Sequence, residues 1–211
     1  MTISLKKFNH LRPLGIKLLA VSKGKPSSAI RSLALEGQID FGESKLQEAL
    51  IKIEDLTDFP EIRWHFIGPL QKNKVRGVIK AFHVIHSVDS LKLAQRISRI
   101  CSEEHKNVDI MIQVKLREDP AKQGFSHDNL LEVWAEIMEL PNIQIKGLMT
   151  IAPIELDLSQ RKDLFKDCRS LADKLGLKDC SMGMSQDWQV AIEAGSTWVR
   201  LGSSLFGERH K

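Results

Sequence analysis

The sequence predicts one domain over residues 1–211, an α/β fold of the (β/α)8 barrel type. Eight short β-branched or apolar runs recur along the 211 residues, and segments with helical periodicity separate them. The apolar fraction of 42% and charged fraction of 27% are typical of a globular chain that buries one core. The competing architecture, an open doubly wound sheet, usually has fewer strands and a glycine-rich first turn. This chain has neither a GxGxxG nor a GxxxxGK[ST] motif.

The predicted strands share a length of five to nine residues and end in polar turns. They cover residues 16–22, 39–43, 63–68, 83–88, 108–116, 143–151, 179–185 and 197–203. Because parallel strands need crossover connections, the helices between them are expected outside the barrel.

The helical segments follow the same alternation and cover residues 26–37, 44–56, 90–103, 126–140, 159–176 and 186–195. The first begins at Pro26 and ends at Gly37, in agreement with the preference for proline at the start of helices and glycine at their end. Ser90 is a candidate N-cap for the third. Apolar stripes are expected over Leu46, Leu50 and Ile53 in the second helix, and over Leu91, Ala94, Ile97 and Ile100 in the third.

Charge and hydropathy exclude several functional classes. The net charge of +4 is too small to indicate nucleic-acid binding. The densest basic stretch, residues 71–80, is either a solvated helix face or a positive field near an anionic ligand. No apolar run approaches the roughly 18–20 residues of a membrane span, and the first residues lack a signal-peptide core. We therefore expect a cytoplasmic protein without a membrane partner.

Cysteine and histidine spacing argues against a metal site. Cys101, Cys168 and Cys180 are scattered and form no CxxC pair, which is typical of buried thiols in a reducing compartment. His83 and His86 lie three apart in a predicted strand and should face opposite sides. His65, between two aromatic residues, is expected in the core, where Trp64 and Phe66 pack against helices.

The loops after the last two strands predict a phosphate site. In such barrels these loops and a short helix N-terminus commonly bind phosphate. Gly202 allows close approach of backbone N–H groups, and Ser203 and Ser204 follow with hydroxyl donors. Ser185 precedes the predicted helix at 186 and offers a second N-terminus. The alternative for this region is an ordinary glycine turn.

Two cations are expected at the same rim. Leu19, Val21 and Lys23 share one strand face, so an inward orientation places the Lys23 amine at the barrel mouth. It would be either a nucleophile for Schiff-base formation or a lysine that extends to solvent. Arg200 shares a face with Trp198, and inside the barrel it would contact either a ligand or an Asp or Glu of a neighbouring strand. An amine, an anion site and a guanidinium together match the needs of pyridoxal 5′-phosphate (PLP).

Several long motifs resemble those of the pyridoxal phosphate homeostasis protein family, also called proline synthase co-transcribed proteins. They are AVSKGKP (20–26), FGESKLQE (41–48), WHFIGPLQKNK (64–74), KGLMTI (146–151) and SMGMSQDWQVAIEAGSTWVRLGSSLFGER (181–209). The resemblance runs from Lys17 onward and implies a fold similar to the barrel domain of alanine racemase.

The resemblance also implies roles for single residues. Lys23 stands where the family binds PLP as a Schiff base, and Arg200 where it contacts the pyridine nitrogen. Ser185, Gly202 and Ser203 stand in the phosphate-binding stretches. The family is thought to bind, store or deliver PLP and to balance vitamin B6 and amino-acid pools, without a firm catalytic activity. PLP-requiring apoenzymes would then be partners, and a monomer is the expected state.

Three departures from the family pattern stand out. Ser44 occupies a position where the family usually has Asn, and Lys115 another where Asn is frequent. The segment before the first strand is short, which suggests a truncated first helix.

Composition bears on catalysis. The chain has no Tyr, whereas alanine racemase needs a tyrosine and a second domain. An arginine beside the pyridine nitrogen also disfavours a protonated ring and hence carbanion chemistry. We therefore expect a PLP-binding protein without robust turnover. The alternatives are a weak racemase or a lysine Schiff-base lyase, and a scaffold with a vestigial barrel mouth.

Overall fold

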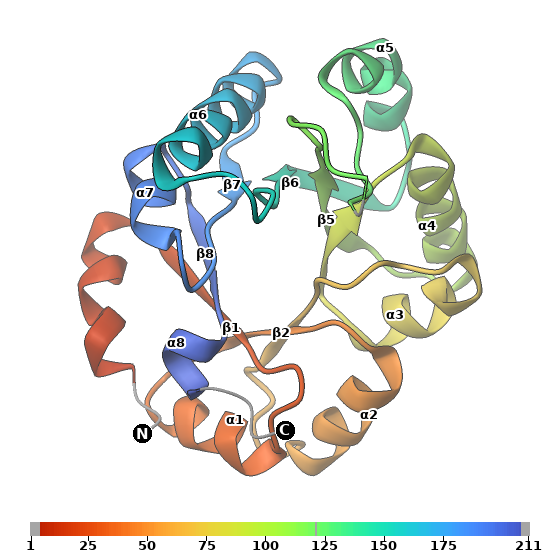
Figure 1. Cartoon of the computed structure of the whole chain (residues 1–211). Helices are drawn as coiled ribbons and strands as arrows, with labels where there is room; N and C mark the ends of the chain where they lie inside the picture. The colour runs from red at the N-terminus through yellow and green to blue at the C-terminus, as the bar shows by residue number, and fades with distance from the viewer. Residues whose placement is uncertain (1–4, 121, 208–211) are drawn as a thin grey trace.

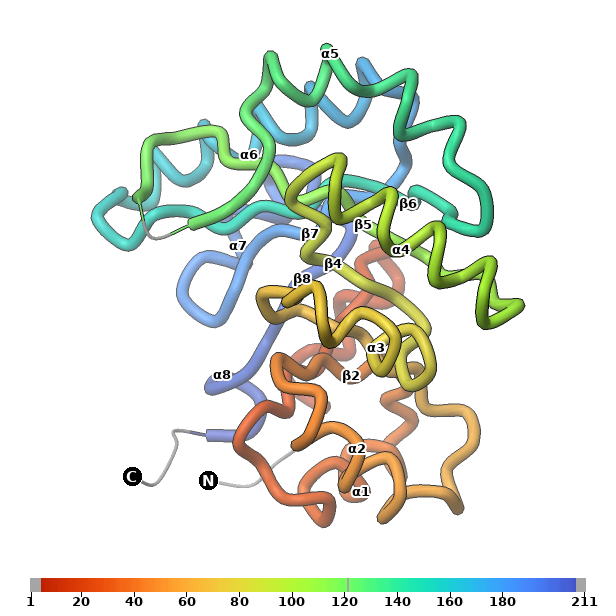
Figure 2. The backbone as a smooth tube through the Cα atoms, turned by 90° about the vertical axis from the view of Figure 1, so that its right-hand side faces the viewer, coloured from red at the N-terminus to blue at the C-terminus, as the bar shows by residue number. Residues whose placement is uncertain are grey.

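The computed structural model describes residues 5–120 and 122–207 and confirms the predicted fold class. Eight parallel strands close into a barrel in the order β1 to β8, and helices surround it (Figure 1). The strands are β1 Lys17–Val21, β2 Asp40–Glu43, β3 Arg63–Phe66, β4 Val84–Val88, β5 Val108–Gln113, β6 Ile143–Met149, β7 Asp179–Ser181 and β8 Trp198–Leu201. The first and the last strand close the barrel, since β1 pairs with β8, and Figure 2 shows the helices around the strands from the side.

The helices follow the strands in the predicted order. They are α1 Ser27–Leu35, α2 Leu46–Asp55, α3 Val75–Ala81, α4 Leu91–Glu103, α5 His127–Met138, α6 Leu158–Lys174, α7 Trp188–Glu193 and α8 Ser203–Phe206. Two 3-10 helices, η1 Lys6–Leu14 and η2 Lys72–Lys74, add to them. No helix of the described residues is long and apolar enough to cross a membrane.

Apolar side chains form two groups, one on each side of the strands. The larger group fills the space between strands and helices, where Trp64 and Phe66 pack as predicted. The smaller group is a layer inside the barrel made by Leu19, Met111, Met149 and Trp198. Because side chains alternate along a strand, residues two positions after Leu19 and Trp198 also point inward, nearer the mouth.

Several local predictions need correction. Of the stripe expected in α2, Leu46 is buried and Ile53 packs against the core, but Leu50 is 46% exposed, because the helix buries Ala49 and Lys52 in its place. Ser90 stands at the N-cap of α4, but its hydroxyl donates to the Asp89 carboxylate and caps no backbone N–H. The predicted strand 179–185 ends at Ser181, since Gly183 has φ +92°, outside the extended region.

The segment before β1 is a 3-10 helix that the sequence did not predict. Phe8 and Leu11 of η1 are buried, and the Phe8 ring meets the Trp188 ring edge-on at 5.8 Å. Gly15, at φ +74°, ends η1 and leads into β1. The short N-terminal segment therefore packs against α7 through aromatic contacts.

The basic stretch 71–80 is a solvated helix face, the first of its two predicted readings. Lys72, Arg76 and Lys80 are exposed along η2 and α3, and Arg76 forms ion pairs with Glu103 and Glu104. The three cysteines are free and buried, as expected.

Candidate functional site

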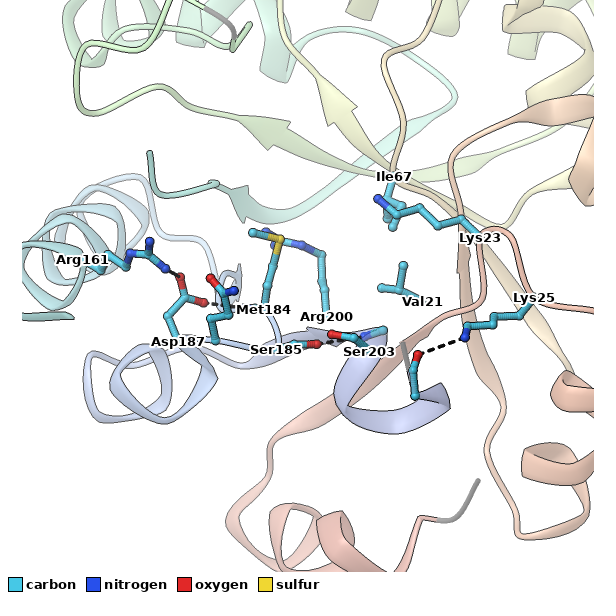
Figure 3. Close-up of a pocket in the computed structure, with 13 residues that line it drawn as sticks. Val21, Lys23, Lys25, Ile67, Arg161, Met184, Ser185, Asp187, Arg200 and Ser203 are labelled. Carbon is cyan, nitrogen blue, oxygen red and sulfur yellow. Dashed lines mark hydrogen bonds and ion pairs between the residues drawn. The ribbon is translucent and has the colours of Figure 1, made fainter. Parts of the chain in front are cut away.

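All five predicted site residues line one cavity at the C-terminal end of the strands. The cavity has a volume of about 280 Å³. Its walls include Lys23 after β1, Ser185 after β7, and Arg200, Gly202 and Ser203 from β8 and the turn that follows (Figure 3). A single small ligand in this cavity can therefore contact the amine, the guanidinium and the turn.

Lys23 extends into this cavity from the turn after β1. Figure 3 shows its side chain reaching toward Ile67, with Val21 below it on the same inner face of the chain. The period-2 alternation that places Leu19 in the inner layer thus also directs Val21 and Lys23 inward. The amine is part of the cavity wall, as the first of its two predicted roles requires.

A buried network holds the turn that carries Lys23. The Lys52 amine, from α2, donates to the Ser22 carbonyl at 2.9 Å and to the carboxylate of Glu43 at 2.7 Å. The Ser22 hydroxyl donates to the same Glu43 oxygen at 2.6 Å. Burial raises the pKa of the Glu43 carboxyl, and hydrogen bonds from Lys52 and Ser22 oppose that rise. The residue before Lys23 is therefore fixed to β2 and α2.

The residue after Lys23 is fixed by the same network. Glu48 accepts hydrogen bonds from the backbone N–H of Gly24 at 2.5 Å and from the Lys52 amine at 2.6 Å. Sequence reasoning missed Lys52, Glu43 and Glu48, although the two glutamates lie in the FGESKLQE motif. A lysine in a helical segment gave no sign that it would be buried.

Arg200 points inward and is only 5% exposed. Its guanidinium donates to the Ser181 carbonyl at 2.5 Å, to the Ser181 hydroxyl at 2.9 Å and to the Thr150 carbonyl at 2.8 Å. Among residues 5–120 and 122–207, no Asp or Glu forms an ion pair with it, so the alternative of a neighbouring-strand carboxylate does not hold. Burial lowers the pKa of Arg200 to about 10.

The turn after β8 presents backbone donors to one point. The N–H groups of Gly202 and Ser204 donate to the Ser185 hydroxyl oxygen at 3.4 and 3.2 Å. The buried Ser204 hydroxyl oxygen has no hydrogen-bond partner in the described part of the chain. The short helix α8 begins directly after Gly202. Two backbone N–H groups of this turn therefore converge on one oxygen atom, an arrangement that can also bind an anion.

The predicted helix N-terminus at Ser185 is wrong in position. α7 begins at Trp188, with Asp187 before it, because the Asp187 carboxylate accepts from the Met184 N–H at 2.7 Å and forms a turn. Asp187 is also bound by Arg161 of α6 at 3.0 Å, and both line the cavity. Ser185 therefore contributes its hydroxyl from a braced turn, not from a helix end.

The histidine predictions hold in the described residues. His65 and His86 are fully buried, whereas His83 is exposed. His83 and His86 therefore face opposite sides of the strand. Burial lowers the pKa of both His65 and His86, well below the usual value for His86. No group of three metal-ligating side chains occurs in the part of the chain that the structure describes.

The departures from the family pattern lie outside the cavity wall. Lys115 lines a separate depression with Arg117 and Lys122. Ser44 lies where β2 and β3 approach closely, since a Cβ on Gly68 would stand 2.2 Å from the Ser44 carbonyl oxygen. The last two residues of the long C-terminal motif, 208–209, lie outside the described residues. Lys25, which sequence reasoning did not assign, lines the cavity and donates to the Gly207 carbonyl at 2.9 Å.

Comparison with known proteins places these features in a family context. Residues 5–210 match the family described as alanine racemase, N-terminal domain. A pyridoxal phosphate homeostasis protein of Synechocystis sp. is 42% identical over 203 residues, which cover 93% of each chain. PipY of Synechococcus elongatus, solved without PLP, is 41% identical with a TM-score of 0.94 over 98% of this chain and 100% of PipY. PipY solved with PLP bound is 40% identical, with a TM-score of 0.90 over 96% and 99%.

Proposed function

The chain belongs to the family of pyridoxal phosphate homeostasis proteins, and on this premise we propose that it binds PLP and takes part in intracellular PLP and amino-acid homeostasis. The observation that supports this most directly is the joint position of Lys23, Arg200 and the Gly202–Ser203 turn around one cavity. A PLP-bound structure of the relative PipY agrees with it.

The residues present fit the cofactor. PLP has an aldehyde, a phosphate and a pyridine nitrogen, and the cavity offers an amine, convergent N–H donors and a guanidinium. The Ser204 hydroxyl, buried and without a hydrogen-bond partner in the described residues, adds a donor beside the amides. Ser185, whose hydroxyl already lies against these amides, is suited to contact the same phosphate.

In this proposal each residue has a distinct task. Lys23 condenses with the aldehyde to a Schiff base, with loss of water. Gly202, Ser203 and Ser185 bind the phosphate, and Arg200 faces the pyridine nitrogen. When bound, PLP supplies a carbonyl group that reacts with amines and a ring that withdraws electrons. The network of Glu43, Glu48 and Lys52 keeps the Lys23 turn fixed before the ligand arrives.

We propose a carrier rather than an efficient catalyst. The guanidinium of Arg200 already carries a proton and would repel one on the pyridine nitrogen, which weakens the ring as an electron sink. The sequence has no Tyr to serve as a second proton-transfer group. Residual racemase or lyase activity would therefore not exceed that of free PLP by much.

Further attributes belong to the proposal. We propose that residues 1–211 form one domain, that the protein acts as a monomer in the cytoplasm, and that apoenzymes requiring PLP receive the cofactor from it. Neither nucleic acid nor a membrane is part of this proposal.

Absorption spectroscopy tests the site. Wild-type protein with added PLP should show a visible band, and borohydride reduction should add the mass of one reduced cofactor at Lys23. Lys23→Ala should lose both signals while keeping its fold by circular dichroism. Lys115→Ala, outside the cavity, is the matched lysine control and should keep both. A band that persists unchanged in Lys23→Ala would overturn the assignment, and amino-acid racemisation far above the rate with free PLP would overturn the carrier role.

A further inference from the structure

A continuous chain of side-chain contacts runs through the barrel interior to Arg200. The Asp40 carboxylate lies 2.8 Å from His65 Nε2, and His65 Nδ1 lies 2.9 Å from His86 Nε2. His86 Nδ1 lies 3.1 Å from the Ser181 hydroxyl oxygen, which accepts from Arg200 Nη1 at 2.9 Å. Asp40 is the first residue of β2 and Arg200 lies near the end of β8, so the chain joins opposite ends of the barrel.

With both imidazoles neutral, as the burial-lowered pKa values of His65 and His86 favour, only one assignment of protons satisfies every contact. A carboxylate can only accept, so His65 donates from Nε2 to Asp40 and accepts at Nδ1. His86 must then donate from Nε2 to His65 and accept at Nδ1 from the Ser181 hydroxyl. Ser181 receives its own hydrogen bond from the guanidinium of Arg200. In this assignment every donor points from Arg200 toward Asp40, whereas a charged His65 would reverse the His65–His86 and His86–Ser181 bonds.

We propose that Asp40, His65, His86 and Ser181 form a directional hydrogen-bond relay that orients Arg200 in the cavity and adds a counter-charge from the opposite end of the barrel. The four are positioning residues, because none of them lines the cavity. The proposal deepens the proposed function, since the ligand group that Arg200 would meet is the pyridine nitrogen of PLP.

Comparison with the other buried cations favours a relay over plain packing. Arg161 has the Asp187 carboxylate at 3.0 Å, and Lys52 has that of Glu43 at 2.7 Å. Arg200, 5% exposed, donates only to neutral acceptors, and the Asp187 carboxylate, which raises its pKa from the wall of the same cavity, is already paired with Arg161. A buried charge is costly without compensation. Hydrogen bonds in series polarise one another, so a carboxylate at one end of the series can stabilise a cation at the other end.

The distant carboxylate is also available for this role. Its nearest cation is Arg63 at 3.8 Å, which is 43% exposed and lies equally far from Asp109. A partly exposed arginine shared between two carboxylates screens Asp40 weakly. Asp40 therefore retains a negative charge that His65, fully buried, contacts directly.

The first test needs no cofactor. Nitrogen-15 spectra of the imidazoles in the unliganded protein should show His65 and His86 as neutral tautomers with the proton on Nε2. A proton on Nδ1 of either ring, or a charged ring at neutral pH, would overturn the relay.

The second test is a double-mutant cycle on PLP affinity and on the wavelength of the visible band. Asp40→Asn keeps an acceptor but removes the charge, and Ser181→Ala breaks the link next to Arg200. Each should weaken PLP binding on the order of tenfold and shift the band, and the double variant should be no weaker than Ser181→Ala alone. Fully additive effects would show that the two ends act independently and would overturn the proposal.

Matched variants separate the relay from general damage. Asp109→Asn removes the other carboxylate beside Arg63 and should leave affinity and spectrum unchanged. Ser181→Thr keeps the hydroxyl and should restore the wild-type band. If Ser181→Ala fails to fold, the pair Asp40→Asn and Asp109→Asn still decides the question, because equal effects of the two would contradict a relay. Absence of PLP binding by wild-type protein would refute the proposed function, whereas the tautomer test would still decide the relay.

Discussion

Two cations beside the cavity, Lys52 and Arg200, are equally buried at 5% exposure but are compensated in opposite ways. Lys52 has carboxylates of Glu43 and Glu48 at 2.7 and 2.6 Å. Arg200 is surrounded by two carbonyls and a hydroxyl.

The difference indicates what each cation does. Lys52 is paired with nearby carboxylates and lies outside the cavity wall. Its ammonium group therefore stabilises the Ser22–Gly24 turn within the protein and does not face a ligand. Arg200 lines the cavity and forms no ion pair among the described residues, and the Asp187 carboxylate in the same wall is paired with Arg161, so in the proposed function its positive potential is available to a ligand. A buried ion pair is evidence for fixed geometry here, and a buried cation without one is evidence for binding.

The largest effect is expected from Lys52→Met, which leaves the fully buried Glu43 carboxylate without its cation. The free energy of unfolding should fall by about 3–5 kcal/mol. Urea denaturation measures the loss, and adding Glu43→Gln should recover part of it. A loss below about 1 kcal/mol would remove the distinction between the two cations.

Low pH should affect the Lys52 and Arg200 networks differently, because of the two only the Arg200 network contains imidazoles. Burial lowers the pKa of His65 and His86 in the folded state, so the unfolded chain binds more protons below pH of about 6.5. Stability is therefore present above that pH and is lost as pH falls, by about 2–3 kcal/mol between pH 7.5 and 5.5 if both rings stay neutral.

Denaturation at several pH values measures this slope. His10→Gln, at an exposed position, should keep it, and His86→Gln should reduce it by about one proton. Stability that does not change over this range would indicate that the buried rings are charged.

A smaller effect is expected from Ser22→Ala, which removes a hydrogen bond to the buried Glu43 carboxylate. The expected loss of stability is about 1–2 kcal/mol. Ser32→Ala is the matched control, because that hydroxyl donates to the Ser28 carbonyl on an exposed helix face. Equal losses for the two variants would show that the Glu43 network does not brace the turn.

The smallest effect is expected from Glu48→Gln. The Glu48 side chain is 29% exposed, and an amide oxygen can still accept from the Gly24 N–H. We expect a loss of at most about 1 kcal/mol, as for other partly solvated pairs, with the visible band of the PLP complex unchanged. A loss comparable to that of Lys52→Met would place the essential counter-charge at Glu48 instead of Glu43.

The sequence was sufficient to predict the fold, and it left the direction of two key side chains open. Alternation of strand and helix patterns predicted the barrel, and the period of two along 19–23 and 198–200 placed Lys23 and Arg200 each on one strand face, which the structure turns to the same interior. The five predicted site residues accordingly line one cavity. Their individual tasks stay predictions that the Lys23 experiment begins to test.

The supporting networks were beyond sequence patterns for a physical reason. His65 and His86 are 21 residues apart on adjacent strands, and Ser181 is 95 residues further, so only barrel closure brings them together. Lys52 was missed because charge normally predicts exposure, and the apolar Leu50 was wrongly placed inside for the converse reason. Strand and helix ends near Gly183 and Ser185 depended on a turn geometry that residue types did not specify.

The hydroxyl of Ser185 lies at the point to which the turn after β8 directs its backbone donors. It accepts from the Gly202 and Ser204 amides, so these donors are engaged within the protein itself. In the proposed function, a bound phosphate would exchange one oxygen acceptor for another, and its departure would leave no amide without an acceptor. Such an exchange would narrow the free-energy difference between the protein with phosphate and without it, as the proposed role of holding and releasing a cofactor requires.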